Sequence, residues 1–317
     1  MLDSYGRNIN YARISITGRC NLRCIYCYGP DAMDPGPPMD FDDILRLVRI
    51  LAQLGITKLK ITGGEPTLRP DLVKIVKAFK DTPGISNVTL TTNGLLLEDL
   101  ARPLAEAGLN SVNISIDSLD PEKYCYLCGS DSLSKVLNGL KAAYLSSLPS
   151  IKVNCVPQVQ TQNEDLLALA DIARHHEIHI RFIELMPIGP GASLERPISN
   201  KDLLKLFEDN LGELIPTSLS YGNGPASYYQ VKGFKGLIGF IAAMGSCFCA
   251  RCNRIRVTSD GFLKTCLHMD QGLLLPLKDE KALKQVITEA IKQKPKSHLF
   301  NSSTISPDLR TMNRIGG

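Results

Sequence analysis

The sequence predicts an α/β fold of repeated strand–helix units, followed by a smaller second domain. Over residues 11–185, short runs rich in β-branched residues alternate with amphipathic segments, which is typical of helices packed on a parallel sheet. Residues 187–191 are rich in Pro and Gly and break this alternation, and shorter strand-like runs follow. We therefore expect two domains, residues 1–186 and residues 187–317.

Six strands are expected in the first domain, over residues 11–17, 58–62, 87–92, 111–117, 151–157 and 178–184. The helical patterns between them cover residues 41–54, 71–80, 96–107, 133–145 and 164–175, and Gly55 and Gly108 follow two of these helices. Six such units fit either a doubly wound open sheet or a partial barrel, and periodicity alone does not choose between them. In both architectures, ligands bind at the carboxyl ends of the strands.

The second domain is expected to contain short strands and two helices. The strand-like runs cover residues 227–232, 237–242, 255–258 and 262–267, and the helical segments cover residues 202–208 and 279–292. A polar tail ending in Gly316-Gly317 completes the chain. At 317 residues and 44% hydrophobic, the chain is long enough for one large core and a smaller one.

Composition argues against nucleic acid and membrane partners. The net charge is +4 with scattered lysines and arginines, and tryptophan is absent, so neither a basic stripe nor a base-stacking platform is indicated. No apolar run approaches the roughly eighteen residues of a membrane span. The first residues lack the apolar stretch of a signal peptide. We therefore expect the ten cysteines to work in a reducing cytoplasm rather than in disulfides.

Cys20, Cys24 and Cys27 form a CxxxCxxC triplet directly after the first expected strand, with no further Cys or His in the next ninety residues. Three thiolates can hold three irons of a [4Fe-4S] cube and leave the fourth iron open to a ligand that is not protein. A structural zinc site needs a fourth ligand, which this triplet lacks. The spacing resembles that of the radical S-adenosylmethionine (SAM) superfamily, and Tyr26 fits the aromatic position of its motif.

Gly63, Gly64 and Glu65 follow the second expected strand, where adjacent glycines allow a close approach to the backbone. A plain turn before the helix at residue 71 is the alternative. In the radical SAM superfamily this motif contacts the amino group of SAM.

A second set of cysteines, Cys247, Cys249, Cys252 and Cys266, lies in the expected small domain, and from spacing alone a zinc ribbon stays open. The run FCARCNRIRVTSDG at residues 248–261, with Cys266-Leu267 after it, closely resembles the GTP 3',8-cyclase (MoaA) family. This family of radical SAM enzymes opens molybdenum cofactor biosynthesis. The resemblance covers nearly the whole chain, including residues 3–7, 90–94 and 181–186 and the terminal Gly316-Gly317.

The resemblance implies a partial (βα)6 TIM-type barrel with a small C-terminal α+β domain that carries an auxiliary cluster. It implies a second [4Fe-4S] cluster on Cys249, Cys252 and Cys266, with Cys247 outside the ligand set. The matched SAM positions are Tyr26, Gly64, Ser115 and Met186. The implied reaction converts GTP to (8S)-3',8-cyclo-7,8-dihydroguanosine 5'-triphosphate, after a SAM-derived radical takes a hydrogen from C3' of the ribose.

Cationic residues on strands can hold a triphosphate through charge-assisted hydrogen bonds. The family positions that bind GTP match Arg13, Lys60, Thr91, Lys152, Arg254 and Arg256, with Lys58 and Arg181 as expected neighbours. Arg254 and Arg256 alternate along a strand, so their side chains should face the same side. In the family the diglycine tail assists the reaction, so the candidate catalytic residues are Arg254, Arg256, Gly316 and Gly317. A frayed end is the alternative for the tail.

Two departures from the family pattern are visible: Lys60 stands where arginine is usual, and Gly18 replaces an aspartate. Cys125, Cys128 and Cys155 are expected to be buried structural cysteines. The histidines of residues 175–179, His175, His176 and His179, are expected on the surface.

The resemblance further implies a low-potential electron donor of the flavodoxin or ferredoxin type and a possible contact with the next pathway enzyme, cyclic pyranopterin monophosphate synthase. A monomer and a homodimer are both compatible with the sequence. Two alternatives stay open: a radical SAM enzyme that modifies peptides or proteins, and a non-catalytic iron-sulfur or zinc protein for electron transfer or interaction.

Overall fold

The computed structural model describes residues 1–28, 36–195, 198–217, 224–244, 248–269, 272–298 and 310–316. The strands of these residues form one 12-stranded sheet with the order β12-β11-β10-β1-β2-β3-β4-β5-β6-β9-β8-β7. The six central strands are parallel neighbours in chain order, β1 (Tyr11–Ser15), β2 (Lys58–Thr62), β3 (Asn87–Thr92), β4 (Ser111–Ser115), β5 (Ile151–Cys155) and β6 (Ile178–Ile183). All six predicted strands are confirmed, and three of them end two residues early.

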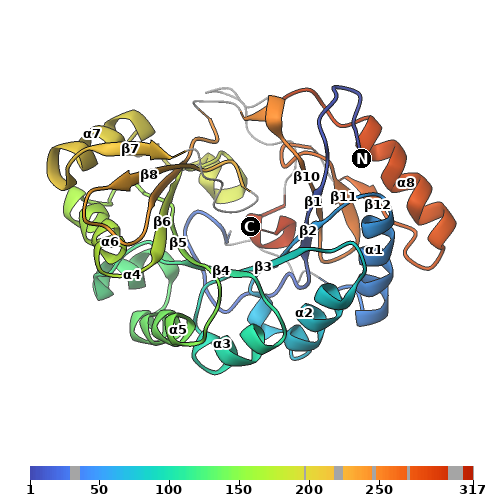
Figure 1. The fold of residues 1–317 in the computed structure, drawn as a ribbon, viewed down its shortest axis with the longest axis horizontal. Coiled ribbons are helices and arrows are strands. Elements are labelled where there is room, and N and C mark those ends of the chain that lie inside the picture. Colours follow the sequence, from blue (N-terminus) through green and yellow to red (C-terminus); the bar gives the residue numbers. More distant parts are fainter. Residues whose placement is uncertain are drawn as a thin grey trace.

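The sheet curves into a partial barrel, with helices on its outer face and the C-terminus inside (Figure 1). The outer helices are α1 (Phe41–Gln53), α2 (Leu72–Asp81), α3 (Leu97–Glu106), α4 (Pro121–Cys128), α5 (Leu133–Leu145) and α6 (Asn163–His175). A doubly wound sheet would carry helices on both faces. The structure therefore confirms the barrel and settles the choice that periodicity left open.

Alternation along the strands separates an apolar outer face from a polar interior. On β5, Ile151, Val153 and Cys155 are buried beneath the helices, whereas Lys152 and Asn154 line the interior cavity. The two-residue period of a strand sends successive side chains to opposite faces, so one short sequence supplies both the core and the site.

The segment after Met186 adds strands to both edges of this sheet. At one edge, β9 (Ile238–Ile241) runs parallel to β6, followed by antiparallel β8 (Ser227–Val231) and β7 (Leu214–Thr217). At the other edge, β10 (Arg254–Val257) runs parallel to β1, followed by antiparallel β11 (Phe262–Lys264) and β12 (Leu273–Leu274). One sheet thus runs through both expected domains, and their division at residue 186 stays a prediction.

Three further helices belong to this segment. They are α7 (Asn200–Leu211), α8 (Glu280–Lys292), which packs on α1, and the short α9 (Met312–Ile315) near the C-terminus. None of the helices in the described part of the chain is long and apolar enough to cross a membrane.

Helix α4 was missed by the sequence analysis, although its ends carry signals. Asp120 accepts a hydrogen bond from the Lys123 N–H at the start, Pro121 is the first helical residue, and Gly129 follows in the left-handed conformation. The helix buries Cys128 but leaves Cys125 exposed. The prediction of a buried Cys125 was therefore wrong: the buried side of this helix is formed by Tyr124, Leu127 and Cys128, and Cys125 lies beyond its edge.

The three histidines of residues 175–179 also differ from one another in exposure. His175 and His176 are exposed, as expected. His179 is half-buried: its Nδ1 accepts a hydrogen bond from the Leu237 N–H at 3.2 Å, and its ring packs edge-on against Tyr228. The prediction of a surface position was wrong for His179, since β9 and β8 extend the sheet beyond β6 and cover it.

Candidate active site

A cavity of about 520 Å³ occupies the barrel interior and is lined by both cysteine triplets. The expected SAM residues Tyr26, Gly64, Ser115 and Met186 also line it, as do Arg13, Lys60, Thr91, Lys152, Arg181, Arg254 and Arg256 from the expected GTP set. Lys58, also a described residue, lies outside this lining. Cys247 and Gly317 lie outside the described residues.

Strand directions place the two triplets at opposite ends of the barrel. Strands β1 and β10 are parallel, with Tyr11 beside Arg254 and Ile14 beside Val257. The first triplet follows the carboxyl end of β1, whereas Cys252 precedes the amino end of β10. Cys266 follows β11, which is antiparallel to β10, and so returns to the end where Cys252 lies. A ligand on each triplet would face the same cavity from either end.

The glycine pair allows the chain itself to approach closely. The Gly64 N–H donates to the Thr17 carbonyl and the Glu65 N–H to the Arg19 carbonyl, both at 2.7 Å. A Cβ atom at Gly63 would lie 2.6 Å from the Thr17 carbonyl oxygen, and one at Gly64 would collide with the Arg19 backbone. The end of β2 therefore packs directly against the loop that leads into the first triplet. This close backbone packing is sufficient to explain glycine at both positions.

Helix α4 holds the other side of this loop. The Cys128 carbonyl accepts from the Arg23 N–H at 2.9 Å, and the Leu127 carbonyl accepts from the Ile25 N–H at 3.0 Å. The last carbonyls of a helix lack intrahelical partners and readily accept such donors. The backbone on either side of Cys24 is thus fixed by the end of a helix.

Glu65 ties the end of β2 to the end of β3. Its buried carboxylate accepts from the Thr92 hydroxyl at 2.7 Å, the Asn93 N–H at 2.6 Å, and the N–H and hydroxyl of Thr67. Burial raises the pKa of Glu65, although these hydrogen bonds act in the opposite direction. The third residue of the glycine motif therefore positions backbone, and its side chain is satisfied by the protein.

Asp117 is a cavity residue that was not among the predicted site residues. Its Oδ2 accepts from the Tyr26 hydroxyl at 2.8 Å, and its Oδ1 accepts from the Val156 N–H at 2.8 Å. Burial raises the pKa of Asp117 to about 6. Its place at the end of the fourth expected strand was the available signal. The hydrogen bond fixes the ring of Tyr26, which precedes Cys27, toward the cavity.

Both triplets present thiols to the same cavity. All cysteines in the described ranges are free, and the three thiols of each triplet line the cavity. Among the described residues, no group of three Cys, His, Asp or Glu side chains is arranged to hold a single metal ion. Thiolates are the ligands of iron-sulfur clusters, so the donor chemistry of each triplet fits such a cluster.

Cations gather in the middle of the barrel. Arg256, Arg13 and Lys60 are register partners on β10, β1 and β2. Burial lowers the pKa of Lys60 well below its usual range, and the charges of Arg181, Arg13 and Lys152 add to this effect. Burial and Arg181 likewise lower the pKa of Lys152 to about 7. Like charges confined in one cavity favour a polyanionic ligand.

Polar neighbours hold these cations in place. Lys60 Nζ donates to the Thr91 hydroxyl at 3.4 Å, and Lys152 Nζ donates to the Ser111 hydroxyl at 3.1 Å. The Arg181 guanidinium donates to Asn154 Oδ1 through Nε at 2.8 Å. Neutral acceptors orient the charges without cancelling them, so the cations remain able to bind an anion.

The C-terminal tail enters the barrel and extends from the first-triplet end to the cations in the middle of the cavity. The Asn313 side-chain amide donates to the Gly18 carbonyl at 3.2 Å, before the first triplet. The Gly316 carbonyl accepts from Arg256 Nη1 at 2.5 Å. Gly316 is buried with a φ of +90°, and a Cβ there would lie 3.0 Å from the Cβ of Ser15. Gly316 is therefore not part of a frayed end, which was the alternative for the tail.

Comparisons with known proteins agree along the whole chain. The sequence profile of the Radical SAM superfamily matches residues 14–188, and that of Molybdenum Cofactor Synthesis C matches residues 178–300. A Clostridium perfringens protein named GTP 3',8-cyclase is 40% identical over 325 residues, which cover all of both chains. A Syntrophomonas wolfei protein of the same name is 38% identical over 327 residues, with the same coverage.

Solved structures share the fold at low sequence identity. Streptococcus suis SuiB bound to S-adenosylmethionine matches with a TM-score of 0.69 and 14% identity, covering 97% of this chain and 77% of that chain. HydG, a maturase of the [FeFe]-hydrogenase, matches with a TM-score of 0.52 and 18% identity, covering 64% of this chain and 49% of that chain. At these identities the likeness concerns the fold alone.

Proposed function

Since the chain belongs to the GTP 3',8-cyclase family of radical SAM enzymes, we propose that it binds SAM and GTP from opposite ends of one barrel cavity. The chain is a radical SAM cyclase of molybdenum cofactor biosynthesis, and it converts GTP to (8S)-3',8-cyclo-7,8-dihydroguanosine 5'-triphosphate. We propose roles for individual residues in binding SAM, GTP and the two clusters.

Cys20, Cys24 and Cys27 would hold the first [4Fe-4S] cluster, and SAM would bind beside this cluster in the cavity. When bound, this cluster supplies the electron that cleaves SAM to a radical able to take hydrogen from C3' of GTP. Tyr26, oriented by Asp117, lines the cavity beside this end, as do Gly64, Ser115 and Met186. These four residues would surround SAM.

The buried cations are the main reason to place GTP in the middle of the cavity. Arg256, Arg13 and Lys60 lie side by side on adjacent strands, Lys152 lines the same cavity from β5, and burial lowers the pKa of each. A triphosphate brings negative charge to such a cavity and forms charge-assisted hydrogen bonds with these groups. Thr91 and Arg181 would add further donors, and Lys58 would act at most from outside the lining.

At the other end, Cys249, Cys252 and Cys266 would hold a second [4Fe-4S] cluster, which would bind the purine of GTP. Arg254 and Arg256 line the cavity beside it, and the Gly316 carbonyl binds Arg256. The tail would therefore fix the orientation of Arg256 against the substrate, and Gly317, which lies outside the described residues, stays a candidate catalytic residue on the resemblance to the family. The barrel wall would limit the access of water to the reacting atoms.

A low-potential flavodoxin or ferredoxin in the cytoplasm would supply electrons, and the next enzyme of the pathway would take the product. Both partners follow from the reaction that the family performs.

Anaerobic iron and sulfide analysis tests the two-cluster account. About eight irons per chain are expected, and four irons with one zinc would refute it.

Cys249→Ala should keep GTP-independent reductive cleavage of SAM but abolish cyclisation, which mass analysis of 5'-deoxyadenosine and product would measure. Cys125→Ala is the matched control, because that cysteine is exposed on α4 and should leave both activities unchanged. Loss of the first cluster in Cys249→Ala would refute the division of labour.

A further inference from the structure

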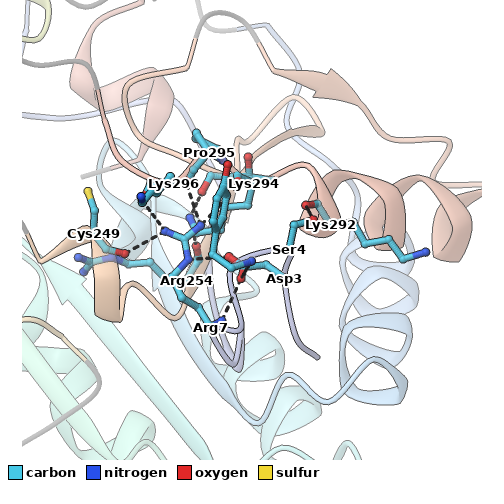
Figure 2. Close-up of polar contacts among 11 residues, drawn as sticks. Asp3, Ser4, Arg7, Cys249, Arg254, Lys292, Lys294, Pro295 and Lys296 are labelled. Carbon is cyan, nitrogen blue, oxygen red and sulfur yellow. Dashed lines mark hydrogen bonds and ion pairs between the residues drawn. The ribbon is translucent and has the colours of Figure 1, made fainter.

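The N-terminal segment clamps the chain that follows α8 onto the second triplet (Figure 2). Arg7 is buried, and its Nη1 donates to the Cys249 carbonyl and to the Lys296 carbonyl, both at 2.9 Å. Its Nη2 donates to the Pro295 carbonyl at 2.7 Å, and Asp3 Oδ2 accepts from its Nε at 2.6 Å. One guanidinium thus joins a cluster-ligand loop to the segment after α8.

This clamp turns the side chain of Lys294 toward the cavity. Lys294 is 2% exposed and lines the cavity. Its ammonium donates to the Arg254 carbonyl at 3.1 Å and to the Thr265 carbonyl. Thr265 directly precedes Cys266, and Arg254 lies two residues after Cys252. The ammonium is therefore held between the backbones that present two of the three thiols.

The ammonium therefore also lies near the thiols, because the carbonyls that it binds belong to residues one and two positions from Cys266 and Cys252. A cluster on three thiolates is anionic and gains a further negative charge on reduction. A cation or N–H donor close to its sulfurs favours the reduced form, and such outer groups tune iron-sulfur potentials.

We propose that Lys294 is a positioning residue for the second cluster, held by the Arg7 clamp so that its ammonium lies beside Cys252 and Cys266 and raises the reduction potential of that cluster. This inference rests on the second cluster proposed above. It assigns a role to a lysine that the sequence analysis left out, because Lys294 follows a helix and belongs to no cysteine motif.

The test is a potentiometric titration of the anaerobically reconstituted full-length enzyme, followed by electron paramagnetic resonance. Added SAM identifies the signal of the first cluster, since it changes only the cluster that binds it. In Lys294→Gln, which can still donate to carbonyls but carries no charge, the second cluster should titrate at a more negative potential. The first cluster should stay unchanged.

Two further variants complete the design. Lys294→Arg keeps the cation and should return the midpoint toward that of the wild type. Lys292→Met is the matched control: this lysine ends α8, its side chain is 55% exposed, and it points away from the cluster-ligand loop (Figure 2). Its substitution should leave both midpoints unchanged.

Each outcome decides the proposal. An unchanged midpoint in Lys294→Gln with both clusters present overturns it. Should Lys294→Gln lose the second cluster, retention of that cluster at the wild-type potential in Lys294→Arg supports the need for a charge, and loss in both variants overturns it. A wild-type enzyme with only the first cluster refutes the proposed function itself, which separates the two failures.

Discussion

At the scale of single residues, the cavity is lined by cationic side chains whose charged form is disfavoured by burial. Lys152 shows this most clearly, because burial beside Arg181 lowers its pKa to about 7. A bound triphosphate favours the ammonium and raises this pKa, so GTP binding should take up a proton above about pH 7. GTP affinity should therefore fall as the pH rises above 7, and below 7 this lysine should contribute no pH dependence.

Calorimetry near about pH 8 in buffers of different ionisation enthalpy measures this proton uptake. Lys152→Met should remove it and weaken GTP binding roughly tenfold to hundredfold, the effect of losing one charge-assisted hydrogen bond. Titration of the GTP phosphates is the same for both enzymes and serves as the internal reference. Equal proton uptake by the variant and the wild type would show that Lys152 does not meet the triphosphate.

Gly64 is the residue whose size the structure constrains most directly. A Cβ there would collide with the Arg19 backbone, which has no flexible side chain to move aside. Gly64→Ala should therefore displace the first-triplet loop and lower the iron content to that of the second cluster alone. Gly224→Ala is the control, since Gly224 lines the same cavity with open space around its Cβ position. Full iron content in Gly64→Ala would contradict the packing account.

At the scale of elements, α4 shows how a helix end can hold a cluster loop. Gly129 ends this helix with a φ of +69°, and a Cβ there would lie 3.1 Å from the Cβ of Arg23. Gly129→Ala should cost about 1 kcal/mol in backbone strain and loosen the carbonyls that hold Arg23 and Ile25. We expect the first cluster to lose iron to a chelator faster than in the wild type. The decay of the absorbance of the cluster measures this rate.

Gly212→Ala provides the comparison, because Gly212 ends α7 with a φ of +102° and has no neighbour within 4 Å of its Cβ position. The strain at Gly212 is at least as large, because φ +102° with ψ −179° lies in a region that is essentially restricted to glycine, but it falls at the end of a different helix. Identical rates of iron loss in both variants would show that α4 does not stabilise the loop.

The sequence predicted the elements better than the contacts between them. The six parallel strands and five of their helices follow from periodicity and caps, which are local. Strand β7 was missed because it contains Pro216, which argues against a strand except at the edge of a sheet, where β7 lies. Strand β12 was missed because it has only two residues. The end of the fourth strand was a sequence signal for Asp117, but its contact with Tyr26 and the contact of Lys294 with Arg254 could be placed only by the fold, because they join distant parts of the chain. The cysteine triplets, by contrast, were visible as spacing.

At the scale of the whole molecule, both chain ends close on the barrel. The N-terminal segment binds the loop of Cys249 through Arg7, and the tail binds Gly18 and Arg256 from inside. Removal of residues 316–317 should free the guanidinium of Arg256 from its carbonyl partner. Cyclisation should then fail while reductive cleavage of SAM continues, as measured by the ratio of product to 5'-deoxyadenosine. A normal ratio in the truncated enzyme would mean that the tail only fills space.

The central claim is that a SAM-derived radical formed at one end of the barrel takes a hydrogen from GTP held in the middle. Anaerobic turnover with GTP deuterated at C3', followed by mass analysis of the released 5'-deoxyadenosine, tests it most directly. We expect one deuterium in 5'-deoxyadenosine, in proportion to the cyclised product. Release of unlabelled 5'-deoxyadenosine at the same rate with and without GTP would contradict the account.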